Sequence, residues 1–130
     1  MKYITLIIGL LVVGCETLTP EQKQQKALRD SVVGEYGTKF KNASVKTVFL
    51  KNGIVEAYRS AMVDGAASFS KVSEHKWEIV NGEIHIKPSS RITHVWRINA
   101  NKSITYIAMI TDGELYNFPN SHQTTEAKIK

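Results

Sequence analysis

Four histidines are the residues of this chain best suited to metal binding or acid–base chemistry: His75, His85, His94 and His122. No two of them stand at the i, i+4 spacing of a helical metal site, and the sequence has no His-Glu-x-x-His motif. His85 and His94 fall on segments that could be neighbouring strands, so a two-histidine metal site is one interpretation. No thiolate or paired carboxylate joins them to complete the three or four protein ligands of a zinc site. The sequence therefore favours surface or rim histidines and predicts no metal site and no cofactor.

The nucleophiles and carboxylates of the sequence indicate a catalytic site no more strongly than the histidines do. Ser68, Ser70 and Ser73 precede His75, but no Gly-x-Ser-x-Gly motif is present to hold a serine on a strained turn. The Asp and Glu residues are dispersed, with no obvious pair for general acid and base roles. We predict no catalytic residues and a protein that is not an enzyme.

Aromatic residues are the remaining candidates for binding. Tyr36, Tyr58, Trp96 and Tyr106 fall on segments with the pattern of strands, and His94 shares an expected face with Trp96. The interior of a small eight-stranded barrel is either filled by side chains or holds one small ligand. Core packing is therefore one interpretation of these five residues, and a weak ligand-binding site is the other.

Cysteine chemistry is confined to one position near the N-terminus. Lys2 precedes an uncharged apolar run, Ile4 to Val13, which is followed by Gly14 and the only cysteine, Cys15. The run would rise about 15 Å as a helix, whereas a membrane span needs roughly 20 residues. It matches the short apolar region of a secretory signal. The segment resembles a bacterial lipoprotein signal peptide with its lipobox.

This resemblance implies cleavage between Gly14 and Cys15, loss of residues 1–14, and acylation of Cys15 by chains such as palmitate, with residues 15–19 as a tether. Two or more acyl chains hold a protein stably in a membrane. The alternative is a buried N-terminal strand with Cys15 as a core thiol. Because Glu16 rather than aspartate follows Cys15, the resemblance implies an outer-membrane location, facing the periplasm, in a Gram-negative cell.

Composition limits the organisation of the rest. A chain of 130 residues that loses a signal peptide supports one domain. The formal charge of +5 is spread among acidic residues rather than gathered in a stripe, which argues against nucleic acid as a partner. With Cys15 acylated, no thiol remains for disulfides, so packing must stabilise the domain.

A helix is expected at residues 20–33. Thr19 suits its N-cap, Pro20 its first position, and Gln22 completes a capping box. Gly34 supplies a stop. The helix would connect the lipid to the domain at 34–130.

The rest of the chain has the pattern of antiparallel strands. Asn52-Gly53 and Asn81-Gly82 each separate two strand-like runs, and both predict two-residue hairpins with type I′ turns. Asp64-Gly65 and Asp112-Gly113 mark further turns, and no helical segment intervenes, which indicates an up-and-down meander. About eight strands are expected, at 33–40, 45–51, 54–60, 67–80 in one or two pieces, 83–87, 91–98, 103–111 and 124–130, with a shorter piece near 114–118.

Alternation supports these strands. Trp77 and Ile79 share one face. In the last strand Thr125, Ala127 and Ile129 alternate with Glu126, Lys128 and Lys130. Such strands close most economically into a small barrel, which removes exposed edges. A two-sheet sandwich is the alternative.

Gly34-Glu35-Tyr36 resembles the Gly-x-aromatic signature that opens the barrel of lipocalin-like proteins. The segments Val48-Phe49-Leu50, Trp77 to Ile84 and Trp96 to Asn99 are similar to a group of small bacterial proteins of unassigned function. The resemblance covers most of the chain after Cys15. It implies a mainly β, lipocalin-like small barrel preceded by one short helix, and it implies little about activity.

Two hypotheses of function remain. In the first, the protein is a membrane-anchored envelope lipoprotein, a non-enzymatic binding or assembly module that contacts another envelope protein or the cell wall. The polar segment 61–74 and the loop 117–124 motivate it. In the second, the barrel carries a small apolar ligand. The first needs only a surface and the second needs a void, so the sequence favours the first.

Overall fold

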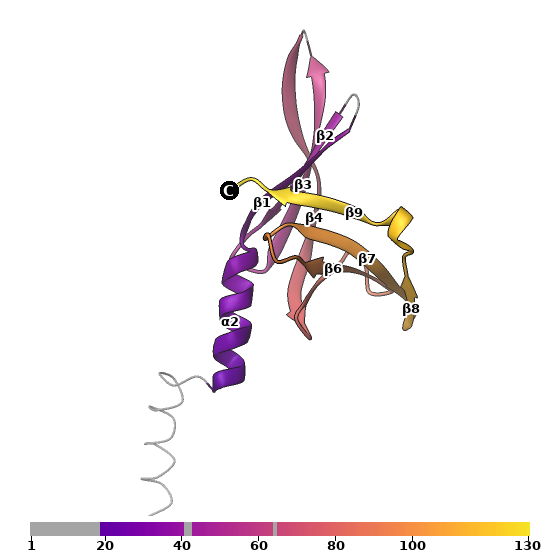
Figure 1. The fold of residues 1–130 in the computed structure, drawn as a ribbon. Helices are drawn as coiled ribbons and strands as arrows, with labels where there is room; N and C mark the ends of the chain where they lie inside the picture. The colour runs from indigo at the N-terminus through magenta and orange to yellow at the C-terminus, as the bar shows by residue number, and fades with distance from the viewer. Residues whose placement is uncertain (1–18, 41–42, 64) are drawn as a thin grey trace, which may run out of the picture.

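The computed structural model describes residues 19–40, 43–63 and 65–130. The expected signal peptide, the cleavage site at Gly14 and Cys15, and the tether before Thr19 lie outside these residues. The elements follow in the order α2 (Pro20–Val32), β1 (Gly34–Phe40), β2 (Ala43–Phe49), β3 (Ile54–Val63), β4 (Ala66–Val80), β5 (Glu83–Lys87), β6 (Ile92–Ile98), β7 (Ile104–Thr111), β8 (Glu114–Asn117), a 3-10 turn (Asn120–His122) and β9 (Thr124–Lys128) (Figure 1).

The strands close into a barrel. Each strand from β1 to β7 pairs antiparallel with the next, and β9 pairs with both β7 and β1. The ring therefore contains eight strands, β1 to β7 and β9. β8 stands outside the ring and pairs with the second half of β7. The prediction of a mainly β, antiparallel barrel preceded by a helix is confirmed, and the sandwich alternative is wrong.

The helix begins at the expected capping box. Gln22 N donates to Thr19 Oγ1 at 3.1 Å, and Thr19 N donates to Gln22 Oε1 at 3.0 Å. These two bonds satisfy backbone donors that the first helical turn leaves without partners. The helix ends at Val32, and Val33 is its C-cap.

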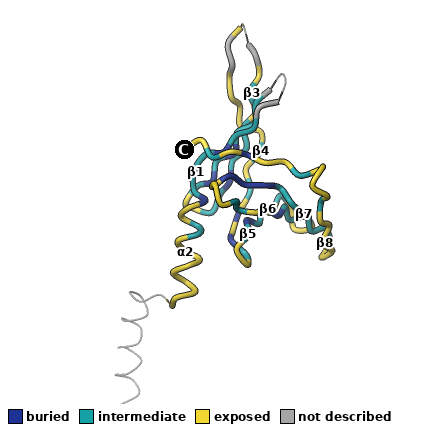
Figure 2. The backbone as a smooth tube through the Cα atoms, in the orientation of Figure 1, coloured by how far each residue is buried: buried dark blue, intermediate teal, exposed yellow. Residues whose placement is uncertain are grey.

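Helix α2 packs against the barrel end that carries the β2–β3 and β4–β5 turns. The Arg29 guanidinium lies 4.7 Å from the ring centre of Trp77 and donates to the carbonyl oxygen of Lys51. Gln25 Nε2 donates to the carbonyl oxygen of Ile79 at 3.1 Å. Val32 is buried, whereas most of the helix is exposed (Figure 2). The last turns of the helix therefore cover this end of the barrel.

One apolar cluster fills the barrel behind the helix. Tyr36 and Trp77 each meet Phe49 edge to face, with ring centres 5.4 Å and 5.3 Å apart. Such aromatic pairs stabilise a core beyond the burial of their area. The buried members of the cluster are Val32, Tyr36, Phe49, Val55, Trp77, Ile79, Ile84, Ile86, Trp96 and Ile104.

The two Asn-Gly turns differ. Asn81 and Gly82 have φ of 51° and 79°, as a type I′ turn requires. Asn52 does not have positive φ, and the loop between β2 and β3 spans residues 50–53, with Leu50 N donating to the carbonyl oxygen of Ile54. The prediction of a two-residue type I′ turn at Asn52-Gly53 is therefore wrong. The Asn52 side chain instead accepts from Ile54 N at 3.0 Å, the local bond for which asparagine is favoured in turns.

The β3–β4 hairpin extends beyond the barrel. β2 pairs with β3 as far as Arg59, and β5 pairs with β4 only from Lys76 onward. Farther out the two strands pair with each other, and the hairpin rises from the barrel (Figure 1). A register shift after Ala57 leaves Val72 as the extra residue of β4. Residues 61–63 and 66–74 of the polar segment are thus continuations of the two strands.

Candidate functional site

A cavity of about 230 Å³ lies in the barrel, on the side of the core away from α2. Along β4, Ile79 contacts the helix, Trp77 lies in the core, and His75 and Ser73 line the cavity. Val55, Ile86 and Trp96 belong to both the core and the cavity wall, so the apolar core is its floor. The lining residues are Thr47, Val55, Ala57, Ser73, His75, Ile86, His94 and Trp96.

One residue of the cavity wall, Trp96, has a side-chain donor without a partner. It is 9% exposed, and among the described residues its Nε1 is the buried side-chain nitrogen or oxygen that lacks a hydrogen-bond partner. Leaving a buried donor unsatisfied costs about 1–3 kcal/mol. In contrast, Trp77 Nε1 donates to the carbonyl oxygen of Leu50 at 3.0 Å. Because Trp96 Nε1 itself is fully buried, an acceptor in the cavity cannot reach it, and the unpaired donor is a local cost of the fold.

An aromatic stack fixes the position of the Trp96 ring. Tyr106 stacks on it, with ring centres 5.0 Å apart and an interplanar angle of 17°. Tyr106 also contacts His94 at 5.1 Å and Phe118 edge to face at 4.8 Å. Burial raises the pKa of the Tyr106 hydroxyl. Tyr106 therefore packs against His94 and Trp96, the two ligand-binding candidates on β6, and it does not line the cavity.

The cavity histidines come from two different strands. Burial lowers the pKa of His94, and the charge of His75 lowers it further. A neutral imidazole offers one donor and one acceptor, whereas a protonated one offers two donors. The wall can therefore change from a mixed hydrogen-bonding surface to a cationic one as pH falls.

Glu126 is a buried acid that the sequence analysis placed among the charged residues of an alternating strand. It is 5% exposed, and its Oε1 accepts a hydrogen bond of 2.9 Å from Thr47 Oγ1. Burial raises the pKa of Glu126, although the Thr47 bond acts in the opposite direction. Ile129, on the other face of this C-terminal segment, is 57% exposed. The last strand thus turns its acid inward, and alternation alone gave no signal of that choice.

No family model, curated protein or solved structure matches this chain. The site is therefore argued from its own geometry. Among the described residues, no helix has the length and apolar character needed to cross a membrane.

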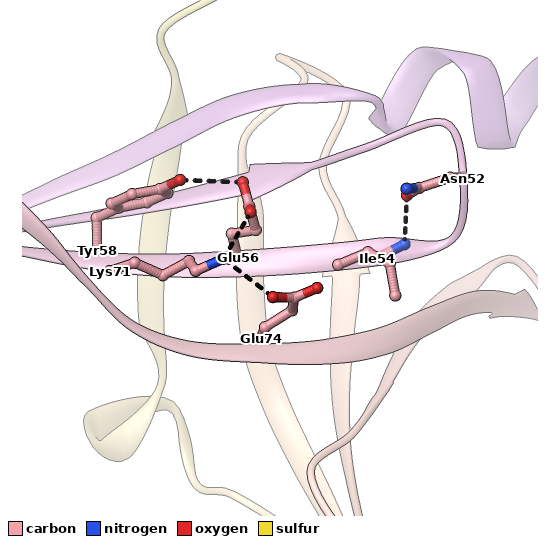
Figure 3. A network of polar contacts seen from close by, with 6 residues as sticks. All are labelled: Asn52, Ile54, Glu56, Tyr58, Lys71 and Glu74. Atoms are coloured by element: carbon pink, nitrogen blue, oxygen red, sulfur yellow. Dashed lines mark hydrogen bonds and ion pairs between the residues drawn. The ribbon is translucent and has the colours of Figure 1, made fainter.

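The other aromatic candidates lie apart from the cavity. Tyr36 is 1% exposed in the core, and its hydroxyl donates to the carbonyl oxygen of Val32 at 2.8 Å. Tyr58 lies in a polar network on β3 and β4 (Figure 3), where its hydroxyl donates to Glu56 at 3.0 Å. Lys71 joins Glu56 to Glu74 in that network. Of the five ligand-binding candidates, the structure places His94 and Trp96 in the cavity wall.

The two histidines of the metal interpretation are separated. His94 lines the cavity, and its partner in the neighbouring strand is Ile86. His85, one residue before Ile86, lines a different groove, beside Lys76 and Lys87. In the described ranges, no group of three or more His, Cys, Asp or Glu side chains could hold a metal ion.

Surface grooves of about 300, 400 and 450 Å³ border β4 or α2. The barrel cavity differs from these grooves because two histidines, His75 and His94, line it.

Proposed function

We propose that this protein is a membrane-tethered binding protein that holds a small ligand in its barrel cavity. The observation that carries the proposal is the wall of this cavity, in which His75 and His94 stand beside apolar residues such as Val55. Sites for small molecules typically combine an apolar lining with a small number of polar groups. The cavity is smaller than the roughly 300–1,000 Å³ usual for drug-sized ligands, so the proposed ligand is small.

The proposed tether is the lipid on Cys15. Its support is the run of sequence from Lys2 to Cys15 and the helix that begins shortly after it. Helix α2 has 13 residues, which corresponds to about 20 Å, and it joins the barrel at the end away from the cavity. The lipid would thus hold the cavity away from the membrane surface, on the periplasmic side of an outer membrane in a Gram-negative cell.

Binding rather than catalysis is the proposed role. Thr47 donates its hydroxyl hydrogen to Glu126, so it is not activated by a histidine. Nucleophilic catalysis needs a nucleophile and a base within hydrogen-bonding reach of each other. Among the described residues, neither Thr47 nor Ser73 makes such a bond to His75 or His94.

Cavity filling tests the proposal. In Ala57→Phe, the larger side chain would occupy the cavity, whereas Ala61→Phe places the same change on the same strand at an exposed position outside it. We expect native mass spectrometry of the detergent-extracted protein to detect a bound small molecule in the wild type and in Ala61→Phe, and not in Ala57→Phe. Repeated absence of any bound molecule from the wild type would refute the proposal.

A second candidate function is contact with another envelope protein through the β3–β4 hairpin. The observation that favours it is the projecting part of β4, which pairs only with β3 and exposes Phe69 and Val72 by 46% and 58%. Unpaired strand edges readily accept a further strand. A photo-crosslinking residue at Phe69 should capture one defined partner in cells. The same residue at Leu115, exposed on β8, is the control, and equal capture from both positions would contradict this function.

A further inference from the structure

We infer that one side of the molecule, formed by helix α2 and the outer face of β4 and β5, binds the anionic head groups of the membrane to which the protein is tethered. This basic surface consists of the charged side chains that line two adjoining grooves. Its cations are Lys26, Arg29, Lys76 and Lys87, and its acid is Glu78. The inference rests on the proposed tether and is independent of the ligand in the barrel cavity.

The sheet places two of these cations directly opposite each other. Lys76 and Lys87 lie on the outside of the barrel, because Trp77 and Ile86 beside them belong to the core. They are partners across β4 and β5, and like charges in this arrangement repel each other. Glu78 pairs with Lys87 at 2.9 Å, whereas Lys76 is exposed and makes no ion pair among the described residues. A bound anion would therefore offset a repulsion that the chain leaves in place.

Helix α2 continues the basic surface toward the tether. Glu78 lines both grooves, so the groove beside Lys76 adjoins the groove beside Lys26 and Arg29. Lys26 pairs with Asp30 of the same helix. Arg29 makes no ion pair within the part of the chain that the structure describes. The four cations of this surface thus face two acids, and positive charge is in excess.

Neighbouring charges leave this excess in place. Lys51 is exposed, and its carbonyl oxygen accepts a hydrogen bond from Arg29, which brings a further cation to the edge of the surface. Glu21 and Glu83 belong to the same elements, but neither lines one of the two grooves. The sequence scatters these cations, and the fold gathers them on one side.

The apolar residues of the grooves also suit a lipid surface. Ile54 and Trp77 line the groove beside Lys76, and Ile79 lines the groove beside Lys26. Protein surfaces that bind at the membrane interface combine apolar area with attraction to anionic lipids. Both components are present here.

The proposed tether brings this surface within reach of the bilayer. Four residues separate Cys15 from Pro20, and four residues span at most about 14 Å. Lys26 and Arg29 follow within about three turns of the helix. The helix can therefore lie along the membrane with its basic side against the head groups.

Lysine reactivity of the full, tethered chain tests the inference. The protein is placed in lipid nanodiscs of phosphatidylcholine, with or without one third phosphatidylglycerol, and mass spectrometry measures the rate at which a water-soluble reagent acetylates each lysine. We expect Lys76 and Lys87 to react at least five-fold more slowly on the anionic discs, since each cation near an anionic surface contributes about that factor. Lys71, on the projecting hairpin, should react equally on both. Salt at 1 M should remove the difference, because the screening length falls to about 3 Å.

Two variants that each remove one charge locate the effect. Lys76→Gln should lower the protection of Lys87 about five-fold. Arg59→Gln is the matched control, because Arg59 is exposed on β3 and lines neither groove, and it should leave that protection unchanged. The wild-type comparison of the two kinds of disc decides the question even if a variant does not fold.

Several results would overturn the inference. Equal rates for Lys76 and Lys87 on the two kinds of disc would do so, as would equal slowing of Lys71. Protection in detergent by inorganic phosphate would indicate a free phosphate as the ligand, and protection in cells but not on anionic discs would indicate an acidic protein. A protein that does not enter the discs would refute the Cys15 tether together with this inference, whereas Ala57→Phe would still test the cavity.

Discussion

Replacement of Tyr36 by phenylalanine isolates the hydrogen bond that joins helix α2 to the barrel. The Tyr36 hydroxyl donates to the carbonyl oxygen of Val32 at 2.8 Å, and both residues are 1% exposed. Tyr36→Phe keeps the ring against Phe49 and removes only the oxygen. The carbonyl of Val32, in the last turn of the helix, would then be left without this donor in a buried position.

The expected loss follows from these two facts. A typical hydrogen bond contributes about 0.5–1.5 kcal/mol, and an unsatisfied buried partner costs about 1–3 kcal/mol. Because the two terms overlap, we expect Tyr36→Phe to lower the free energy of unfolding by about 1–3 kcal/mol. For a domain of this size that corresponds to roughly 4–15 °C in Tm.

Urea denaturation followed by circular dichroism measures the loss, with the slope of unfolding free energy against urea expected to stay unchanged. Burial raises the pKa of Tyr36 to about 12, so the hydroxyl stays protonated and the difference from wild type should be the same at pH 6 and pH 9. Tyr116→Phe is the control, because Tyr116 is 53% exposed and its bond to Glu114 is 3.3 Å long. If Tyr36→Phe destabilises no more than Tyr116→Phe, the reasoning is refuted.

Three further predictions concern other parts of the molecule. Because burial raises the pKa of Glu126 above the ordinary 4.5, the folded state binds its proton more tightly than the unfolded state, and stability should fall as pH rises from about 4.5 through the raised pKa. Glu126→Gln should lack this loss when unfolding is measured from pH 4 to 8. Stability profiles of wild type and variant that run parallel over this range would contradict the prediction. Gly34→Ala should lower the free energy of unfolding by about 1–3 kcal/mol, because φ is 147° and the new Cβ would overlap the carbonyl oxygen of Lys130. In the same urea titration Gly82→Ala should cost less, because no atom lies within 4 Å of its new Cβ. Cys15→Ser should move the protein from the membrane to the soluble fraction on cell fractionation, and continued membrane partition would refute the lipid anchor.

The strands were predictable because local chemistry decides them. Alternation of side chains, the capping box at Thr19 and the Asn81-Gly82 turn are short-range signals, and the structure follows each of them. The prediction of a two-residue turn at Asn52-Gly53 failed because the same dipeptide also suits a longer loop, in which the Asn52 side chain accepts a hydrogen bond from Ile54 N. The extension of the β3–β4 hairpin depends on where neighbouring strands stop, which no local pattern records.

The cavity was harder to predict from the sequence than the strands were. His94 and Trp96 were identified from their shared strand face, and both line it. Ser73 and His75 were noted only for their chemistry and Thr47 was not noted, because no local pattern shows that the fold brings their strands around one cavity. Glu126 was placed by alternation with the charged residues of its strand, yet it lies buried against Thr47. A single acid facing inward depends on one partner that lies 79 residues away in the chain.

Closure of the ring by β9 has a consequence for how the chain reaches this fold. Strands β1 to β7 pair with sequence neighbours and can form as successive hairpins, but β1 meets its second partner only at Ala127 and Lys128. Contacts of such long sequence separation form slowly. Until the final residues of the chain are in place, β1 and β7 remain open edges of a curved sheet, and such edges recruit other strands. Loss of the last five or six residues should therefore cause self-association, although every residue of the cavity wall would still be present.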